Sequence, residues 1–276
     1  MFKSTEPILP FDTIGNIIES LVKDNENGLQ YVKACSLVCQ SFLALCRTHI
    51  FSSIKIKVAG SSQKHNTEAF GQLVLGTPEV ARSIRHLYIV ILDPHSQSVH
   101  LFGQVPQHLA RLQSLTIWRS DSWDVHDVDW NNISSSMQRS LLNLAHIPTL
   151  SHLKLGWINN FPISDLNTCT NLKQLSAEAL YIQVGTGEHD ESASSLLSHK
   201  PMQLQEFDIK IFKMSNDLSL LTARRPDGRT VLNFSGLEKI SVTFFVALYA
   251  VHTREILRMT EQLTEVRFNG KEILNI

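Results

Sequence analysis

The pattern apolar-x-x-apolar-x-apolar occurs eight times after residue 50, and we number its positions 1 to 6. The copies are FSSIKI (51–56), IRHLYI (84–89), LQSLTI (112–117), LSHLKL (150–155), LKQLSA (172–177), LQEFDI (204–209), LEKISV (237–242) and LTEVRF (263–268). Their starting residues lie 22 to 38 residues apart. Each copy is therefore followed by enough chain for a helix or a long loop.

The residues between the apolar positions indicate that each copy is a β-strand. Fifteen of the 16 residues at positions 3 and 5 lie outside the hydrophobic set, whereas a 43% hydrophobic composition leaves about nine by chance. Such alternation is typical of a strand with one buried and one wet face. The position-5 residues, which we expect to form one row on the wet face, are Lys55, Tyr88, Thr116, Lys154, Ser176, Asp208, Ser241 and Arg267.

The segments between the copies carry helical patterns, most clearly at residues 134–145 and 247–263, with shorter candidates at 67–75 and 188–197. Neither a single strand nor a single helix buries its apolar face alone, so neighbouring units must stack. We therefore predict an α/β fold in which the eight strands are parallel neighbours in one sheet, in chain order.

This strand-and-return pattern resembles an irregular leucine-rich-repeat solenoid with a parallel sheet. Three of the seven spacings fall within the usual repeat length of about 20–29 residues. The regular asparagine that follows the last apolar position in that family is missing, so the turns must be stabilised in another way. The corresponding sites include Leu92, Ser120, Ile158 and Leu180.

The first fifty residues carry a different pattern, which predicts three short helices. Asp12 or Thr13 can cap the first helix, and apolar residues follow at helical spacing. Residues 25–28 favour a turn, and apolar stretches at 29–38 and 39–50 follow it. Three helices of this length cannot bury all their apolar surface among themselves. Some of that surface needs a partner, either the rest of the chain or another protein.

The segments ILPFDTIGNIIESLV and ACSLVCQSFLALCRTHIF resemble the F-box, particularly as it occurs in fungal F-box proteins. The resemblance covers residues 7–50 and leaves residues 51–276 as the leucine-rich-repeat-like solenoid. It implies that the F-box binds the Skp-type adaptor of a Skp–cullin–F-box ubiquitin ligase, while the repeats bind a protein substrate. The expected adaptor contacts, some of which must instead be internal core, are Leu9, Pro10, Ile14, Ile17, Ile18, Leu21, Leu37, Val38 and Phe42.

The substrate surface is expected on the position-5 row. Trp118 extends this row, and a loop with Trp123 and Trp130 follows in the longest interval between copies. Insertions of this kind often carry specificity. We expect the strongest contact around Trp118, Lys154 and Trp157; a merely solvated face is the alternative.

Composition and charge narrow the function classes. The formal net charge is −1 over 276 residues, and no basic excess points to nucleic acid. The start of the sequence does not resemble a signal peptide, and the most apolar run, 242–251, is about half the length of a membrane span. We expect an intracellular protein, cytoplasmic or nuclear, that contacts no membrane and keeps its four cysteines reduced.

Known catalytic and metal motifs are missing from the sequence, so we expect no enzyme activity, no cofactor and no metal. Neither a nucleophile elbow, a zinc-protease motif nor a phosphate-binding loop occurs. Cys39 and Cys46 are separated by about 10 Å of helical rise, too far to share a zinc ion. The aspartate-rich loop at 121–130 matches no ordered coordination loop.

The alternative function is a stand-alone leucine-rich-repeat-like scaffold in which residues 7–50 form an N-terminal cap. Solenoids need a cap because their first repeat otherwise exposes an apolar face. The adaptor and the scaffold functions are distinguished by whether the stripe of Leu9, Pro10 and Ile14 is exposed in the isolated chain. In either case residues 49–51 pass directly from the third helix into the first strand, so we expect rigid docking with a continuous core.

Overall fold

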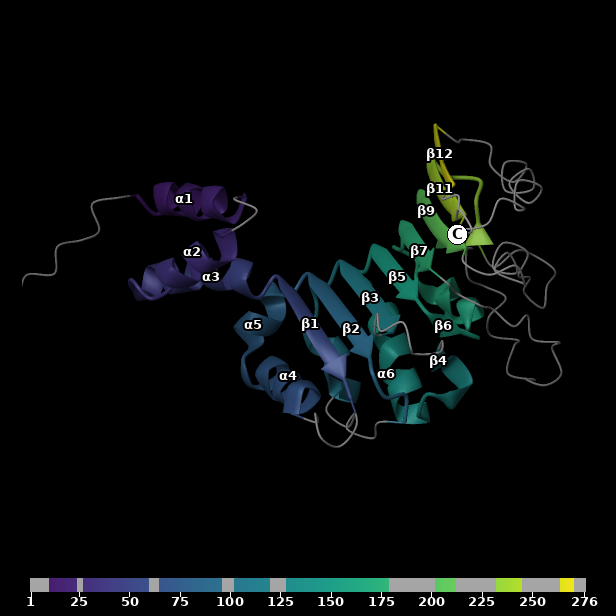
Figure 1. Ribbon diagram of the computed structural model, residues 1–276. Helices are drawn as coiled ribbons and strands as arrows, with labels where there is room; N and C mark the ends of the chain where they lie inside the picture. Colours follow the sequence, from purple (N-terminus) through teal and green to yellow (C-terminus); the bar gives the residue numbers. More distant parts are fainter. Residues whose placement is uncertain are drawn as a thin grey trace, which may run out of the picture.

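The structure is a computed structural model, and it describes residues 10–23, 27–59, 65–95, 102–119, 128–178, 202–211, 232–244 and 264–270. It has an α/β fold in which three N-terminal helices precede a long parallel sheet (Figure 1). Within these residues, every helix is too short or too polar to cross a membrane.

The three N-terminal helices enclose a small core of their own. They are α1 (Phe11–Lys23), α2 (Gly28–Cys35) and α3 (Gln40–Ile50), close to the predicted boundaries. Ile14 and Ile18 of α1 are buried against Val32 of α2 and Cys46 of α3. Gly28 makes the tight turn between α1 and α2 possible, since a side chain there would collide with the carbonyl oxygen of Leu21.

Eight parallel strands form the sheet, in chain order. They are β1 (Ser53–Val58), β2 (His86–Ile91), β3 (Ser114–Arg119), β5 (His152–Gly156), β7 (Gln174–Glu178), β9 (Glu206–Ile211), β11 (Lys239–Phe244) and β12 (Glu265–Gly270). All eight copies of the sequence pattern contribute a strand, and consecutive copies pair without any shift in register. The predicted parallel sheet in chain order is confirmed.

Each strand begins two residues later than the sequence pattern, at position 3 instead of position 1. In several copies, position 1 closes a tight turn before the strand; the Leu112 N–H, for example, donates to the Leu109 carbonyl over 3.1 Å. The side chain at position 1 still faces the core, and it is 2% exposed or less in the six copies from Ile84 to Leu237. An apolar residue at position 1 therefore indicates a buried side chain but does not indicate where the strand begins.

A backbone ladder at the start of the strands holds the register. The carbonyl oxygen at position 2 of each copy accepts two hydrogen bonds, from the N–H groups at positions 2 and 3 of the next copy. Gln113 and Ser114, for example, both donate to Arg85. The arrangement recurs at all seven junctions with donor–acceptor distances of 2.8–3.0 Å. Backbone hydrogen bonds thus align the start of each strand with the next, without a row of side-chain hydrogen bonds.

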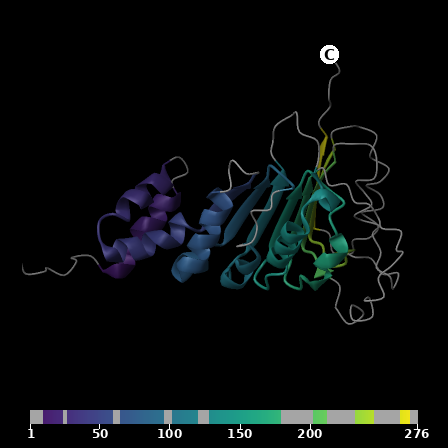
Figure 2. The same ribbon diagram turned by 90° about the horizontal axis from the view of Figure 1, so that it is seen from below.

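Helices and short turns cover one face of the sheet and leave the other face open (Figure 2). The helices are α4 (His65–Gly76), α5 (Pro78–Ser83) and α6 (Ser135–Ala145), and the 3-10 turns are η2 (Phe102–Gln104), η3 (Pro106–His108), η4 (Trp130–Asn132) and η5 (Ile163–Thr168). Two small parallel pairs, β4 (Val128–Asp129) with β6 (Ile158–Asn159) and β8 (Met202–Gln203) with β10 (Leu232–Asn233), lie outside the main sheet. In the first seven copies, the side chains at positions 4 and 6 pack between the sheet and the layer of helices and turns.

Two of the four predicted inter-strand helices are confirmed, because α4 and α6 match 67–75 and 134–145. The candidates at 188–197 and 247–263 lie outside the described residues. Helix α5 and the 3-10 turns were not predicted, since they are too short to show a helical period.

The expected continuous core between the helices and the sheet is wrong. Within the described residues, the apolar side chains form two separate clusters, one inside α1–α3 and one beneath the sheet. Helix α3 approaches α5, and Arg47 pairs there with Glu79 at 3.4 Å. Both side chains are largely exposed, so this ion pair stabilises the junction by at most about 1 kcal/mol.

Replacing Leu153 by Asp should lower the free energy of unfolding by about 4 kcal/mol or more, because it buries an unpaired carboxylate. Leu153 is 1% exposed and points into the layer beneath β5. His152→Asp is the matched control, since His152 is the exposed neighbour on the same strand. Its effect should stay within about 0.5 kcal/mol in denaturant unfolding. Equal losses for both variants would contradict the assignment of the buried face.

The four cysteines should react with an alkylating reagent in the order of their exposure. Cys39 is exposed, whereas Cys46 and Cys169 are buried. Burial also raises the pKa of the Cys169 thiol to about 12, so its reactive thiolate is scarce at pH 8. Mass spectrometry should show rapid labelling of Cys39 in the native protein and labelling of Cys169 only after unfolding. Rapid labelling of native Cys169 would contradict the packing beneath β7.

Candidate functional site

The open face of the sheet carries three parallel rows of side chains, from positions 3, 5 and 7 of each copy. Position 7 lies one residue beyond the six-residue pattern. The predicted position-5 row is formed as expected, since each member is the register partner of the next, from Lys55 and Tyr88 at one end to Ser241 and Arg267 at the other. The row brings together residues that are more than 200 apart in sequence.

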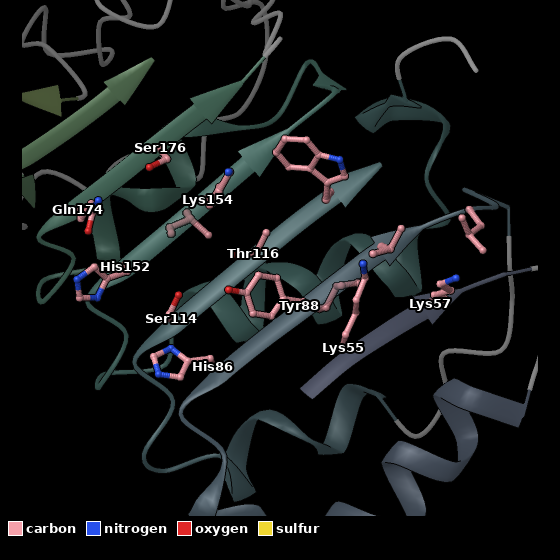
Figure 3. Close-up of a pocket in the computed structure, with 15 residues that line it drawn as sticks. Lys55, Lys57, His86, Tyr88, Ser114, Thr116, His152, Lys154, Gln174 and Ser176 are labelled. Carbon is pink, nitrogen blue, oxygen red and sulfur yellow. The ribbon is translucent and has the colours of Figure 1, made fainter. Parts of the chain in front are cut away.

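A concavity of about 630 Å³ lies on this open face, over strands β1, β2, β3, β5 and β7 (Figure 3). The labelled side chains rise from neighbouring strands toward the same space. The residues that line it are Lys55, Lys57, His86, Tyr88, Ile89, Val90, Leu92, Ser114, Thr116, Trp118, His152, Leu153, Lys154, Gln174 and Ser176. The concavity therefore covers the N-terminal two thirds of the sheet.

Trp118 is held flat on the sheet by the absence of a side chain on the next strand. Its register partner on β5 is Gly156, and a Cβ atom there would overlap the indole ring. The ammonium group of Lys154 lies 4.8 Å from the centre of the same ring, in a cation–π arrangement. Gly156 and Lys154 thus fix the position of a half-buried aromatic surface within the concavity.

Charge is distributed unevenly along the open face. At positions 3, 5 and 7, strands β1, β2, β3 and β5 carry the cations Lys55, Lys57 and Lys154 and no carboxylate. Strands β7, β9, β11 and β12 carry Glu178, Glu206, Asp208 and Glu265 together with Lys210, Lys239 and Arg267. The β1 end is therefore a cationic surface, whereas the β12 end has mixed charge.

Three of the four carboxylates at the β12 end form ion pairs with lysine or arginine side chains. Glu178 lies 3.0 Å from Lys210 and 4.0 Å from Lys154. Lys239 pairs with Glu206 at 3.0 Å, and Arg267 pairs with Glu265 on its own strand. In the described part of the chain, by contrast, no carboxylate pairs with Lys55 or Lys57. These two lysines supply most of the uncompensated charge.

His86, which lines the concavity, adds little charge near pH 7. Burial lowers the pKa of His86 below its ordinary value of 6.5, and the charges of His152 and Arg85 lower it further. His86 is therefore neutral at pH 7. The positive charge of the concavity at this pH thus does not depend on His86.

A second candidate surface lies on the N-terminal helices. Seven large hydrophobic residues are exposed in the described part of the chain, and all except Tyr88 belong to this region. They are Ile17, Val22, Leu29, Tyr31, Leu37 and Val38. Leu37 and Val38, in the loop between α2 and α3, are the most exposed, at 86% and 68%. Such a concentration of exposed apolar side chains is typical of an interaction surface.

Two of the nine predicted adaptor contacts are corrected by their burial. Ile14 and Ile18 are 3% and 0% exposed and fill the core of the three helices, because the centre of the α1 stripe faces α2 and α3. Leu21 and Phe42 are partly buried against the same core. The remaining described members, Pro10, Ile17, Leu37 and Val38, are exposed, and Leu9 lies outside the described residues.

One of the twelve predicted substrate contacts is also corrected. Trp130 is 5% exposed and packs edge-on against Phe161, with 4.8 Å between the ring centres, so it belongs to the core. Thr116 lines the concavity but is only 7% exposed between its neighbours. Trp123 lies outside the described residues.

Trp157 does not belong to the lining of the concavity. Its backbone adopts a left-handed conformation with φ of 59°, immediately after β5. Its N–H donates to the Glu178 carbonyl, and its carbonyl accepts from the Val128 N–H. This bend redirects the chain from β5 into β6 and away from the open face.

Several residues of the open face were not among the predicted contacts. They are Lys57, His86 and His152, which line the concavity, and Gly156, which lies against the Trp118 ring. The position-3 histidines were identified as wet-face residues, but only the position-5 row was assigned to binding. Lys57 and Gly156 lie at position 7, one residue past the six-residue pattern. Extending the alternation by two residues would have found both.

Gly156→Ala should destabilise the protein by about 1–3 kcal/mol, because the new methyl group overlaps the Trp118 ring. Most of this loss should disappear when Trp118 is also replaced by Ala, giving a measurable coupling in a double-mutant cycle. Gly15→Ala is the control, since nothing lies within 4 Å of the added atom. It should be neutral or stabilising, as expected for a helix interior. Additive effects of Gly156→Ala and Trp118→Ala would contradict the packed arrangement.

Comparison with known proteins does not identify a family: no protein-family model matches the chain, and neither does any curated protein sequence. Among the described residues, no group of three or more histidine, cysteine, aspartate or glutamate side chains is placed to hold a metal ion. The aspartate-rich loop lies mostly outside these residues; within them, Asp129 accepts a hydrogen bond from the Asn131 N–H over 2.9 Å. The candidate sites are therefore the concavity and the apolar surface of α1–α3.

Proposed function

We propose that this chain is the substrate-recognition adaptor of a Skp–cullin–F-box type ubiquitin ligase. In this proposal residues 7–50 are the F-box and contact the Skp-type adaptor, while residues 51–276 form a leucine-rich-repeat-like solenoid that holds a protein substrate. The observation that carries the proposal is the location of the exposed large hydrophobic side chains: of the seven in the described residues, six lie on the helical region. That region also carries the F-box-like sequence.

The loop between α2 and α3 supports a protein partner most directly. Leu37 and Val38 are held there by turn hydrogen bonds from their own N–H groups to the carbonyls of Ala34 and Cys35. Burying a side chain of this kind in an interface contributes about 1.5–3 kcal/mol. On α1, Ile17 and Val22 lie at the two edges of the stripe whose centre is buried, since successive residues turn by about 100°. An apolar partner would complete this half-covered surface.

The stripe that was expected to distinguish an adaptor-binding module from a cap is divided, since Pro10 is exposed, Ile14 is buried and Leu9 lies outside the described residues. The arrangement of the cores favours a partner protein over a simple N-terminal cap. A cap would have to cover the apolar face of β1, but Phe70 and Val74 of α4 already lie in the cluster with Ile56 and Val58 of that strand. The small core of α1–α3 belongs to a different cluster. The helical region is thus not needed to close the first repeat, which leaves its exposed surface for another molecule.

The chain would act by proximity, with no bond-making chemistry of its own. Holding a substrate beside the ligase raises the effective concentration of its lysines near the conjugating enzyme. Helix α3 is followed after two residues by β1, so the adaptor surface and the open face are joined without a long linker. A short connection of this kind limits how far apart the two bound proteins can move.

Replacing Leu37 and Val38 together by Ser should lower the affinity for a purified Skp-type adaptor at least tenfold, since about 1.4 kcal/mol of lost burial is enough for that change. Isothermal titration calorimetry measures the effect. The matched control is Tyr88→Ser, which removes the exposed large hydrophobic residue of the sheet. It should leave adaptor binding unchanged. Circular dichroism checks that both variants stay folded.

The neighbouring Cys39 gives an independent measurement on the native chain, because it is exposed and lies next to Leu37 and Val38. Adding the adaptor should protect this thiol from alkylation. If the native protein fails to bind a Skp-type adaptor, or binds it without protecting Cys39, the assignment of this surface is wrong. Absence of adaptor binding altogether would favour a stand-alone interaction scaffold.

A further inference from the structure

We propose that the β1–β5 half of the open face binds an acidic, extended segment of the substrate protein. The aspartate and glutamate side chains of that segment would contact the lysines of this face. The inference deepens the proposed function, because it names the class of substrate that the repeats would hold. It rests on three features of the concavity: its uncompensated lysines, its size and its aromatic floor.

Most of the cationic charge at this end has no acidic counterpart among the described residues. Lys55 and Lys57 are exposed on β1 and have no carboxylate partner among the described residues, and the facing positions of β2 and β3 carry no acid. Lys154, on β5, shares the single carboxylate of Glu178 with Lys210. A partner with carboxylates would be attracted to this end and repelled or unaffected at the β12 end. The charge pattern therefore places an acidic partner at the β1–β5 end of the open face.

The size of the surface fits a short extended segment. Strands β1 and β5 are separated by three strand spacings of about 4.8 Å, so the lysines at its two sides are roughly 14 Å apart at the backbone. Positions 3 to 7 span about 13 Å along each strand. An extended segment rises about 3.3 Å per residue, so four or five residues cross this surface. Alternate side chains of such a segment could face Lys55 and Lys154.

The floor of the concavity is aromatic at its centre. Tyr88 is 42% exposed on β2, and Trp118 is fixed flat on β3 by Gly156 and Lys154. An apolar side chain between the acidic residues could pack against these rings. Tyrosine and tryptophan lose little conformational entropy on binding and are enriched at interface hot spots. The expected segment thus combines carboxylates with an apolar residue.

The hydrogen-bond donors of this cationic surface favour a carboxylate ligand over a phosphate group or nucleic acid. Positions 3, 5 and 7 of β1, β2, β3 and β5 hold lysines and no arginine, and the bidentate fork that suits phosphate is provided by arginine. The chain has a formal net charge of −1, so it lacks the basic excess typical of nucleic-acid binding. The positive charge is local, as a short acidic segment requires.

The test uses the full chain and a random 12-residue peptide library at pH 7.5, where His86 is neutral. Selected peptides should be enriched in aspartate and glutamate and carry an apolar residue between them. A labelled peptide from this pool should then bind the native chain and lose at least tenfold in affinity with Lys55→Glu, measured by fluorescence anisotropy. Lys239→Glu is the matched control on β11, and it should change the affinity less than twofold.

Three results would overturn the inference: selection of no peptides or of peptides without acidic enrichment, equal losses for Lys55→Glu and Lys239→Glu, or equally tight binding of a labelled oligothymidine. Circular dichroism of each variant separates loss of binding from loss of fold. Adaptor binding, measured on the same preparation, keeps the two proposals distinguishable. A chain that binds the Skp-type adaptor but selects no acidic peptides refutes only this inference, whereas the opposite result refutes only the ligase role.

Discussion

The fixed register between consecutive strands is the constraint on which the rest of the structure depends. At every junction one carbonyl oxygen accepts two N–H groups from the next copy, at 2.8–3.0 Å. These bonds place position 4 beside position 4 and position 6 beside position 6 across eight strands. Because side chains alternate along a strand, a shift of one residue would move a buried row to the open face. The backbone pairing and the hydrophobic core therefore support the same alignment.

The same register builds the candidate site. It sets Gly156 opposite Trp118, so that the indole lies over a strand that has no side chain at that point. It also sets Glu178 opposite Lys210, which neutralises charge at the β12 end, and leaves Lys57 opposite Val90 without an acid. The cationic surface and the paired surface thus follow from which residues the alignment makes neighbours. Residues far apart in sequence thereby become neighbours on one open face.

The sheet could be predicted from the sequence because its signal is local and repeated. Alternation within each copy identified the strands, and the repetition indicated parallel neighbours. The strand starts were misplaced, since an apolar residue at position 1 such as Leu112 serves the core equally well from a turn. Helix α5 was missed because six residues are too few to show a period.

The candidate site was only partly predictable, since burial and charge pairing depend on neighbours from other copies. Trp130 looked like an exposed contact because its partner Phe161 lies 31 residues away in sequence. Ile14 and Ile18 could not be separated from Ile17 by periodicity alone, since all three lie on one stripe. The asymmetry between Lys55 and Lys239 became visible only when the strands were aligned and the cross-strand ion pairs were known.

The core of α1–α3 is separate from the core beneath the sheet, and we propose that the chain binds two proteins on two independent surfaces. Hydrogen–deuterium exchange of the full chain, with and without a purified Skp-type adaptor, tests it most directly. The adaptor should slow exchange at residues 10–50 and leave strands β1 to β12 unchanged. Unchanged exchange at residues 10–50, or protection confined to the strands, would contradict the proposal.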